Sequence, residues 1–180
     1  MEDDDFQSLH QYLSPQAIIY DPLKAGSIDG TDTIPHDKAI TRAMEADYKP
    51  NTRLQSNPEK TLFVGRLNPN TSEEKVKEVF MSFGNVKSCH LVRDIITGFS
   101  KGYAFVEYEN ERNAALAYKN GNRTVIDGKM ILVDFECERL LPGWIPRRLG
   151  GGFGGKKDSG QLRFGSRDRP FKKPINVSLK

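Results

Sequence analysis

The sequence predicts an α+β fold, a four-stranded antiparallel sheet with two helices on one face, in the chain order βαββαβ. Two observations carry this prediction. Four short segments alternate in hydrophobicity with the period of strands, and two segments between them follow the period of helices. This order is the split βαβ arrangement. We expect the domain to span residues 59–137, between an acidic N-terminal arm (residues 1–58) and a basic extension (residues 138–180) rich in Gly, Arg and Lys.

The first half of the domain contains one strand, one helix and a second strand. The first strand, residues 61–67, turns Leu62 and Val64 inward and Phe63 outward. Thr71, with Glu74 three residues later, has the spacing of a capping box. The helix that follows is expected to bury Val76, Val79, Phe80 and Phe83. The second strand, residues 86–93, turns Cys89 and Leu91 inward and leaves His90 on the outer face.

The second half repeats the pattern with a third strand, a helix and a last strand. The third strand is residues 101–108, and the helix runs from Glu109 to Lys119 before Asn120 and Gly121 stop it. The last strand, residues 130–135, turns Ile131, Val133 and Phe135 inward. Its other side chains, Leu132 and Asp134, are expected on the same outer face as Phe63.

The third strand has an inverted distribution of side chains. Tyr103 and Phe105 point to one face, whereas the small or branched Ala104 and Val106 point to the other, where they suit a core. Large rings are therefore expected on the open face of the sheet. Flat rings in such a position stack on unpaired bases, and Lys101 at the start of the strand can reach a phosphate.

Two segments resemble the motifs of the RNA recognition motif, a ferredoxin-like fold. Residues 101–108 fit its octamer at every position, and residues 62–67 fit its hexamer except that Arg66 occupies the usual Asn position. The resemblance implies RNA binding on the outer face of the sheet. The candidate contacts from this domain are Phe63, Tyr103, Phe105, Lys101, Arg66, His90, Leu132 and Asp134.

Charge is distributed unevenly along the chain, whose net charge is +3. Residues 1–60 hold 6 basic and 11 acidic side chains, residues 61–136 hold 10 of each, and residues 137–180 hold 11 and 3. A basic extension beside a neutral domain is consistent with phosphate contacts, although a solvated, disordered end has the same composition. The candidate phosphate contacts are Arg147, Arg148, Lys156 and Lys157.

The glycine-rich segment after residue 149 allows more than one interpretation. We expect it to be flexible, so that its backbone can follow a phosphate chain. Residues 150–156 also fit the start of a nucleotide-binding loop, but Lys157 stands where a hydroxyl group must bind Mg²⁺. Trp144 either stacks on a base or anchors this segment to the domain through burial of its ring.

The N-terminal arm contains little that could form a core. Residues 1–35 are rich in proline and turn residues, so we expect an extended conformation. One short amphipathic helix is predicted at about residues 35–48. This helix either packs on the neighbouring domain or docks a partner.

Several classes of protein are excluded by composition. No apolar run approaches the ~18 residues of a membrane span, and the acidic N-terminus is unlike a signal peptide, so a cytosolic or nuclear location is expected. Two cysteines and three histidines form no cluster at metal-ligand spacing, so we expect neither a metal nor a cofactor. No catalytic arrangement can be assembled, which predicts a protein that is not an enzyme and has no small-molecule substrate.

A further resemblance concerns residues 143–155, Gly-Trp-Ile-Pro-Arg-Arg-Leu-Gly-Gly-Gly-Phe-Gly-Gly, directly after the domain. This segment resembles the family of RNA-binding proteins of the U1 and U11 small nuclear ribonucleoproteins. Residues 20–32, 97–103 and 159–171 are more similar to its minor-spliceosome branch.

The resemblance implies a nuclear component of the minor spliceosome that functions in pre-mRNA splicing. It would bind a stem-loop of U11 small nuclear RNA, support recognition of the 5′ splice site and contact other particle proteins through residues 1–58. The alternative is a domain used mainly for protein contacts within a ribonucleoprotein.

Overall fold

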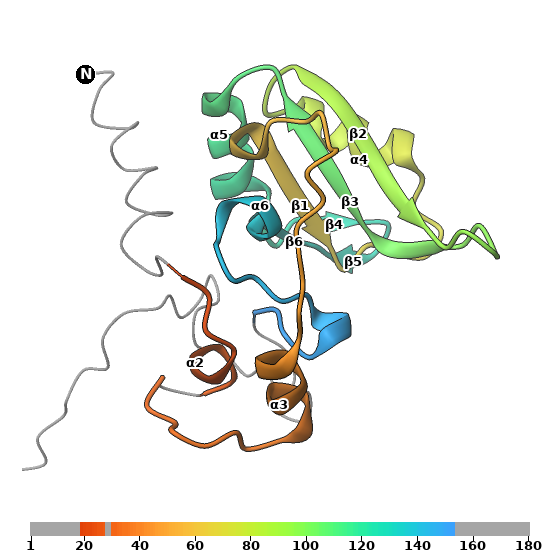
Figure 1. The fold of residues 1–180 in the computed structure, drawn as a ribbon. Helices are drawn as coiled ribbons and strands as arrows, with labels where there is room; N and C mark the ends of the chain where they lie inside the picture. The colour runs from red at the N-terminus through yellow and green to blue at the C-terminus, as the bar shows by residue number, and fades with distance from the viewer. Residues whose placement is uncertain (1–18, 28–29, 154–180) are drawn as a thin grey trace, which may run out of the picture. The chain divides into compact units, whose positions relative to one another are not determined.

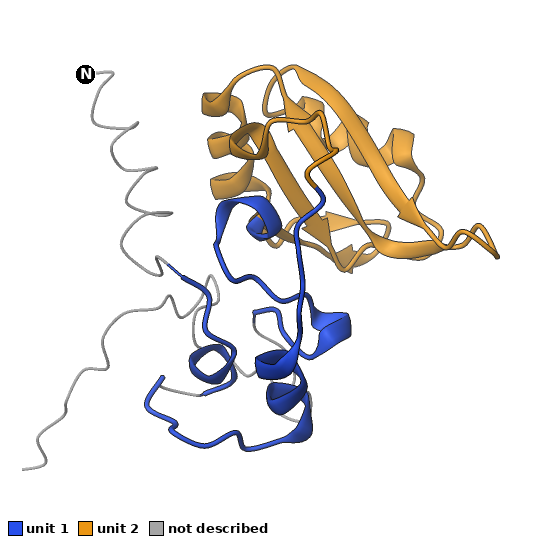
Figure 2. Cartoon of the chain, viewed as in Figure 1, with its two compact units in different colours: residues 1–51, 137–180 blue, residues 52–136 orange. Residues whose placement is uncertain are grey.

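A computed structural model of the protein describes residues 19–27 and 30–153. The chain divides into two compact units, shown in Figure 2. One, the sheet unit, is residues 52–136. The other, the flanking unit, combines the chain before and after it, residues 1–51 and 137–180.

The sheet unit contains the predicted four-stranded antiparallel sheet (Figure 1). Its strands lie in the order β2-β3-β1-β6, and every neighbouring pair is antiparallel. The predicted order βαββαβ and the α+β class are confirmed. The elements are η1 (Pro58–Lys60), β1 (Thr61–Gly65), α4 (Glu73–Met81), β2 (Val86–Arg93), β3 (Ser100–Tyr108), α5 (Glu111–Gly121), β4 (Val125–Ile126), β5 (Lys129–Met130) and β6 (Leu132–Phe135).

The predicted last strand is divided in the structure. Met130 pairs with Val125 in a separate two-stranded sheet, β4-β5, and the pairing with β1 begins at Leu132. The predicted directions of the side chains are nevertheless confirmed, because Val133 and Phe135 are buried whereas Leu132 is only half-buried.

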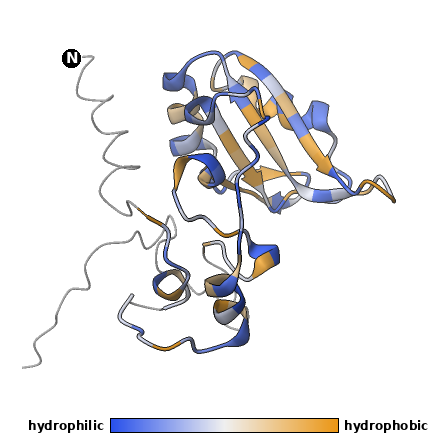
Figure 3. Cartoon of the chain, viewed as in Figure 1, coloured by the Kyte–Doolittle hydropathy of each residue, from blue (hydrophilic) through white to orange (hydrophobic). Residues whose placement is uncertain are grey.

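One face of the sheet forms the core of the sheet unit. Figure 3 shows hydrophobic residues on the strands of the sheet, interrupted by hydrophilic ones. The buried side chains of the sheet meet those of both helices, and the Tyr108 hydroxyl donates to the Phe80 carbonyl at 2.8 Å. The helices contribute Val76, Phe80, Ala114 and Ala117, and the strands contribute Leu62, Val64, Leu91, Ala104, Val106, Val133 and Phe135.

Helix α4 begins one residue later than its capping box predicts. Ser72 is the N-cap, and its Oγ accepts a hydrogen bond from the N–H of Lys75 at 3.2 Å. Thr71 is buried and instead donates its hydroxyl to Asp127 Oδ2 at 2.7 Å. Both residues are of the capping type. A partner 56 residues away in the chain therefore decides which of them caps the helix.

The flanking unit is folded where the structure describes it. Its elements are α2 (Pro22–Gly26), α3 (Lys38–Glu45), α6 (Cys137–Leu140) and η2 (Arg147–Leu149). The core consists of Tyr20, Ala25, Ala43 and Ile145, so both ends of the chain contribute to it. Helix α3 lies within the range of about 35–48 in which a helix was predicted, whereas the extended conformation expected for the other parts of the arms is not observed over residues 20–27 and 137–153.

Candidate nucleic-acid interface

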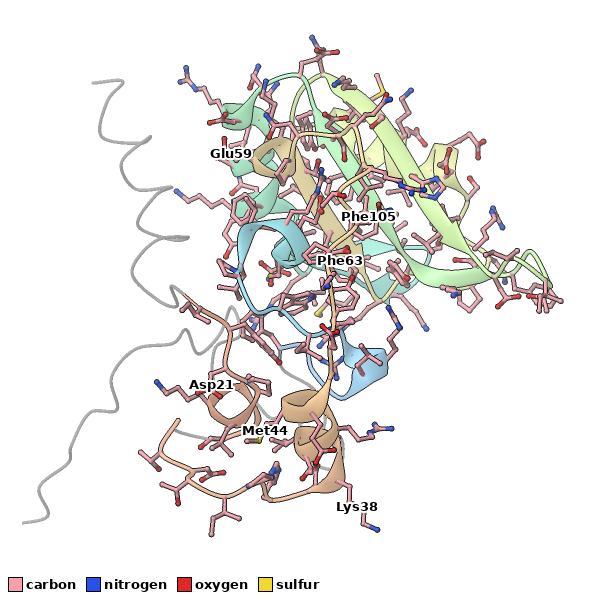
Figure 4. All side chains as sticks on the ribbon, in the orientation of Figure 1. Asp21, Lys38, Met44, Glu59, Phe63 and Phe105 are labelled. Carbon is pink, nitrogen blue, oxygen red and sulfur yellow. The ribbon has the colours of Figure 1, made fainter. Side chains whose placement is uncertain are left out.

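Three aromatic side chains form a cluster on the face of the sheet opposite the helices. We call Phe63, Tyr103 and Phe105 the ring cluster. The centroid of the Phe63 ring lies 5.6 Å from that of Tyr103 and 5.8 Å from that of Phe105, and the last two are 6.1 Å apart. Their strand neighbours Leu62, Val64, Ala104 and Val106 are fully buried, whereas the rings remain partly exposed. Figure 4 labels Phe63 and Phe105 on neighbouring strands.

The register of the strands continues the ring cluster into a row across the whole sheet. Phe63 pairs with Phe105 on one side and with Asp134 on the other, and Phe105 pairs with His90. Directly paired residues point to the same face. The predicted residues His90, Phe105, Phe63 and Asp134 therefore form one line over four strands. Leu132 pairs with Gly65 in the next row.

Gly65 allows the Phe63 ring to lie close over strand β1. A Cβ atom at Gly65 would be 2.8 Å from Phe63 Cε1 and 3.1 Å from Cζ. Such distances are too short for carbon atoms in contact. The absence of a side chain at Gly65 therefore allows the Phe63 ring to lie close to the sheet. The hexamer motif does not indicate this contact.

Two exposed cations lie on neighbouring segments at one end of the ring face. Arg66 directly follows β1, and Lys101 begins the octamer in β3. The N–H of Leu67 donates to the carbonyl of Gly102 at 2.9 Å, which brings these two segments together. Arg66 has a left-handed backbone with φ of 61°. Asn adopts this conformation more readily than most residues, which explains why the motif usually has Asn here.

Glu107 lies at the other end of the ring face, and its side chain is buried. Its carboxylate accepts hydrogen bonds from the N–H of Asn57 at 3.0 Å, from Lys87 Nζ at 3.1 Å and from Ser88 Oγ at 3.2 Å. Burial alone would raise the pKa of Glu107, but these hydrogen bonds outweigh it and hold the pKa below its usual value. Sequence reasoning missed Glu107, because its position in the octamer accepts any residue.

The predicted phosphate contacts Arg147 and Arg148 lie in the flanking unit, and both are exposed. Arg147 Nη2 donates to the carbonyl of Phe153 at 2.8 Å. The Arg148 guanidinium lies 5.5 Å from the centroid of the Tyr48 ring. Lys156 and Lys157 lie outside the described residues.

The glycines after Leu149 are buried rather than free. Gly150, Gly151 and Gly152 pack tightly, and the N–H groups of Gly151 and Gly152 donate to the carbonyls of Pro146 and Ile145. The expected flexible glycine segment is therefore wrong over residues 150–152. Trp144 packs in the same core, with its ring 5.0 Å from that of Tyr20 and 5.1 Å from that of Phe153. Trp144 therefore packs within the flanking unit, and its predicted anchoring to the domain is not among these contacts.

Within the described residues, neither the Cys89 thiol nor a group of metal-ligating side chains adds a second site. Burial raises the pKa of the Cys89 thiol to about 11, so the thiol is protonated and unreactive at neutral pH. Within residues 19–27 and 30–153, no three His, Cys, Asp or Glu side chains are grouped so that they could hold a metal ion. In that same part of the chain, every helix is too short or too polar to cross a membrane.

Comparison with known proteins agrees with this geometry. Residues 62–132 match the family model of the RNA recognition motif. The chain is 60% identical to the U11/U12 small nuclear ribonucleoprotein 35 kDa protein of Danio rerio, over 93% of this chain and 80% of that protein. It is 62% identical to the Homo sapiens protein of the same name, over 92% of this chain and 67% of that protein. The U1 small nuclear ribonucleoprotein 70 kDa of Arabidopsis thaliana is 45% identical, over 69% of this chain and 30% of that protein.

Proposed function

Because the chain belongs to the family of U11/U12 small nuclear ribonucleoprotein 35 kDa proteins, we propose that it binds a stem-loop of U11 small nuclear RNA and supports recognition of the 5′ splice site. Membership of this family and an RNA recognition motif make it an RNA-binding spliceosomal protein. The proposal adds which RNA is bound and for what purpose. A nuclear location and a structural rather than catalytic role follow from it.

The observation that carries the proposal is the exposed ring cluster on the open face of the sheet. Rings so close together can stack on two or three neighbouring unpaired bases, and each stacked base contributes about 1 to 3 kcal/mol. Unpaired bases are found in the loop of a stem-loop RNA. The ring cluster therefore supports binding of the loop. His90, Leu132 and Asp134 are proposed to contact the edges of these bases.

Phosphate contacts are proposed for the cations outside the ring cluster. Arg66 and Lys101 are exposed next to the open face, and Arg147 and Arg148 are exposed on the flanking unit. Each cation that neutralises a phosphate releases counterions, which makes affinity depend on salt. We assign the phosphates of the stem to Arg147 and Arg148, and to Lys156 and Lys157 in the basic end of the chain.

The second candidate function is protein contact within the particle. The predicted contact region, residues 1–58, includes exposed apolar side chains, of which Ile34 is 76% and Met44 is 52% exposed. Such residues suit a protein partner. This role can coexist with RNA binding, since the ring cluster belongs to the sheet unit and both apolar residues belong to the flanking unit. We propose other proteins of the particle as these partners.

An equilibrium titration tests the proposed RNA contact. The full chain is titrated with a U11 stem-loop and with the same stem closed by a short unrelated loop. The proposal predicts that the stem with the native loop binds more tightly, and that a Phe63→Ala, Phe105→Ala double variant removes most of the difference. Equal binding of both RNAs by the unaltered protein would favour the protein-contact function instead.

A further inference from the structure

The turn that carries Arg147 and Arg148 is folded against the N-terminal part of the chain, and Tyr20 makes the first contact between them. Its side chain is buried, and its hydroxyl donates to the carbonyl of Gly152 at 2.7 Å, across 132 residues of sequence. The Tyr20 ring also packs edge-on against Trp144 and Phe153, at centroid distances of 5.0 and 5.2 Å. The N–H of Tyr20 donates to the carbonyl of Pro142 at 2.8 Å.

The second contact joins helix α3 to the glycine that ends the turn. Gly150 follows η2 with a left-handed backbone, φ of 93°. A Cβ atom at Gly150 would be 2.1 Å from the carbonyl oxygen of Ala39, in the first turn of α3. Backbone therefore packs directly on backbone at this point. A side chain of any kind at Gly150 would force the two segments apart.

The third contact orients Arg148 itself. The Tyr48 ring lies 5.5 Å from the Arg148 guanidinium, at the distance of a cation–π interaction. The Tyr48 hydroxyl donates to Glu138 Oε1 at 2.5 Å, and the same oxygen accepts a hydrogen bond from the N–H of Asn51 at 3.2 Å. The N-terminal segment thus supplies the ring on which the guanidinium rests, and Glu138 fixes that ring through its hydroxyl group.

This N-terminal segment is unsuited to binding phosphate, because residues 1–60 carry 11 acidic and 6 basic side chains. Tyr20 itself is only 3% exposed and presents no surface to a ligand. We infer that Tyr20 is a positioning residue for RNA binding: through it, the N-terminal segment holds residues 145–153 in the fold that presents Arg147 and Arg148 together. This inference rests on the proposed function, in which these arginines bind the stem.

The physical basis is conformational entropy. Two arginines on an unordered chain must lose backbone and side-chain freedom when they bind a phosphate pair, whereas a folded turn has already lost it. Loss of the Tyr20 contacts should therefore weaken binding of a stem-loop on the order of tenfold, the effect of losing preorganisation in a small contact. Binding of bases by the sheet unit should stay the same.

The test uses the full chain and two RNA probes, a U11 stem-loop and a single-stranded RNA with the sequence of its loop. The variants are Tyr20→Ala, the double variant Arg147→Ala with Arg148→Ala, and the combination of all three. Thr41→Ala is the matched control, because Thr41 lies in α3 and its side chain is exposed. Trp144 is the only tryptophan of the sequence, so its fluorescence reports on the flanking unit specifically.

The inference predicts four results. Tyr20→Ala shifts Trp144 emission to the red and weakens binding of the stem-loop about tenfold. It leaves the affinity for single-stranded RNA unchanged. The triple variant binds the stem-loop no more weakly than the arginine double variant, because Tyr20 acts only through the arginines. Thr41→Ala changes none of these measurements.

Two results would overturn the inference. In the first, Tyr20→Ala shifts the Trp144 emission but binds the stem-loop as tightly as the unaltered chain. In the second, the triple variant loses as much binding free energy for the stem-loop as Tyr20→Ala and the arginine double variant lose in sum. If the arginine double variant nevertheless binds weakly, the proposed stem contact survives and only the role of Tyr20 is wrong. If the arginine double variant binds normally, the stem contact fails as well.

A second variant covers the case in which Tyr20→Ala disturbs the whole protein, which would appear as lost binding of the single-stranded RNA. Gly150→Ala opens the same packing from the other side, through its clash with Ala39. It should reproduce the red shift and the roughly tenfold loss for the stem-loop alone. Normal stem-loop binding by a red-shifted Gly150→Ala variant would contradict the inference.

Discussion

Phe63 and Phe105 are direct partners across strands β1 and β3, with ring centroids 5.8 Å apart and planes at 61°. The two rings belong to different motifs of the sequence, the hexamer and the octamer. The antiparallel register makes them one surface. Because each ring is only partly exposed, neither alone presents the area of a base, and the stacking surface depends on both.

Removal of one ring tests this surface. Phe105→Ala should weaken binding of a U11 stem-loop by about 1 to 3 kcal/mol, the contribution of one stacked base. Leu116→Ala is the matched control, because Leu116 is 45% exposed and lies on α5, which packs on the other face of the sheet. Fluorescence anisotropy measures both affinities. Equal affinities for the two variants, with the fold intact, would show that the rings do not hold RNA.

Gly65→Ala should displace the Phe63 ring without removing it. The added Cβ would lie 2.8 Å from Phe63 Cε1, and the end of that ring is free to move because it is partly exposed. Gly65 is buried, but the added Cβ meets only the Phe63 ring, so we expect a loss of about 1 kcal/mol in the free energy of unfolding. We also expect a measurable loss of RNA affinity. A calorimetric scan and a titration check the two effects. An unchanged affinity would mean that RNA binding does not depend on how close the Phe63 ring lies to the sheet.

Arg66→Asn should raise stability while it weakens RNA binding. The left-handed backbone at Arg66 favours Asn, so a gain of about 0.5 to 1 kcal/mol in the free energy of unfolding is expected. If Arg66 touches a phosphate, the salt dependence of affinity falls by about one unit of slope. Arg66→Lys keeps the charge and the backbone strain, so it serves as the control for both effects. If the salt dependence of RNA affinity is the same in Arg66→Asn as in the unaltered protein, Arg66 does not contact a phosphate.

Glu107→Gln should destabilise the sheet unit by about 1 to 3 kcal/mol at pH 7, because a buried carboxylate with three charge-assisted or backbone hydrogen bonds is lost. The pKa of Glu107 is lowered by folding, so its contribution is present above the unfolded pKa of about 4.3 and is lost as pH falls through the lower folded value. Urea unfolding at pH 7 and pH 3 measures this. The two proteins should differ less in free energy of unfolding at pH 3 than at pH 7. An equal difference at both pH values would contradict the proposed contribution of the Glu107 carboxylate.

The flanking unit should unfold in alkali. Burial, together with the hydrogen bond to Glu138, raises the pKa of Tyr48 to about 12. Its contribution to stability is therefore present below the unfolded pKa of about 10 and is lost as pH rises through 12. Trp144 emission should report this loss. Tyr48→Phe cannot ionise, so its emission should depend less on pH in that window. An identical pH dependence in both proteins would exclude Tyr48 as the cause.

The sequence was sufficient to predict the sheet and its outer face. The period of two along residues 101–108 determines which side chains share a face, and hexamer and octamer together determine that β1 lies next to β3. The row from His90 to Asp134 follows from these local patterns. Interactions within one strand, or between the two strands that carry the motifs, can thus be predicted from the sequence.

What could not be predicted depends on contacts between distant residues. The choice of Ser72 over Thr71 as helix cap is decided by Asp127, and the fold of the N-terminal arm is decided by residues that follow the domain. Tyr20 and Gly152 are 132 residues apart, and no periodicity in either segment indicates the other. For the same reason the three glycines were expected to be flexible, whereas they close a packed turn.

The identity of the bound RNA tests the central claim most directly. The chain is crosslinked to RNA in nuclear extract, purified under denaturing conditions, and the attached small nuclear RNA is sequenced, with a Phe63→Ala, Phe105→Ala variant as the control. We predict that U11 RNA is recovered, that the crosslinks lie in the loop of a stem, and that the variant recovers far less. Recovery of U1 RNA in place of U11, or of no small nuclear RNA, would contradict the proposed function.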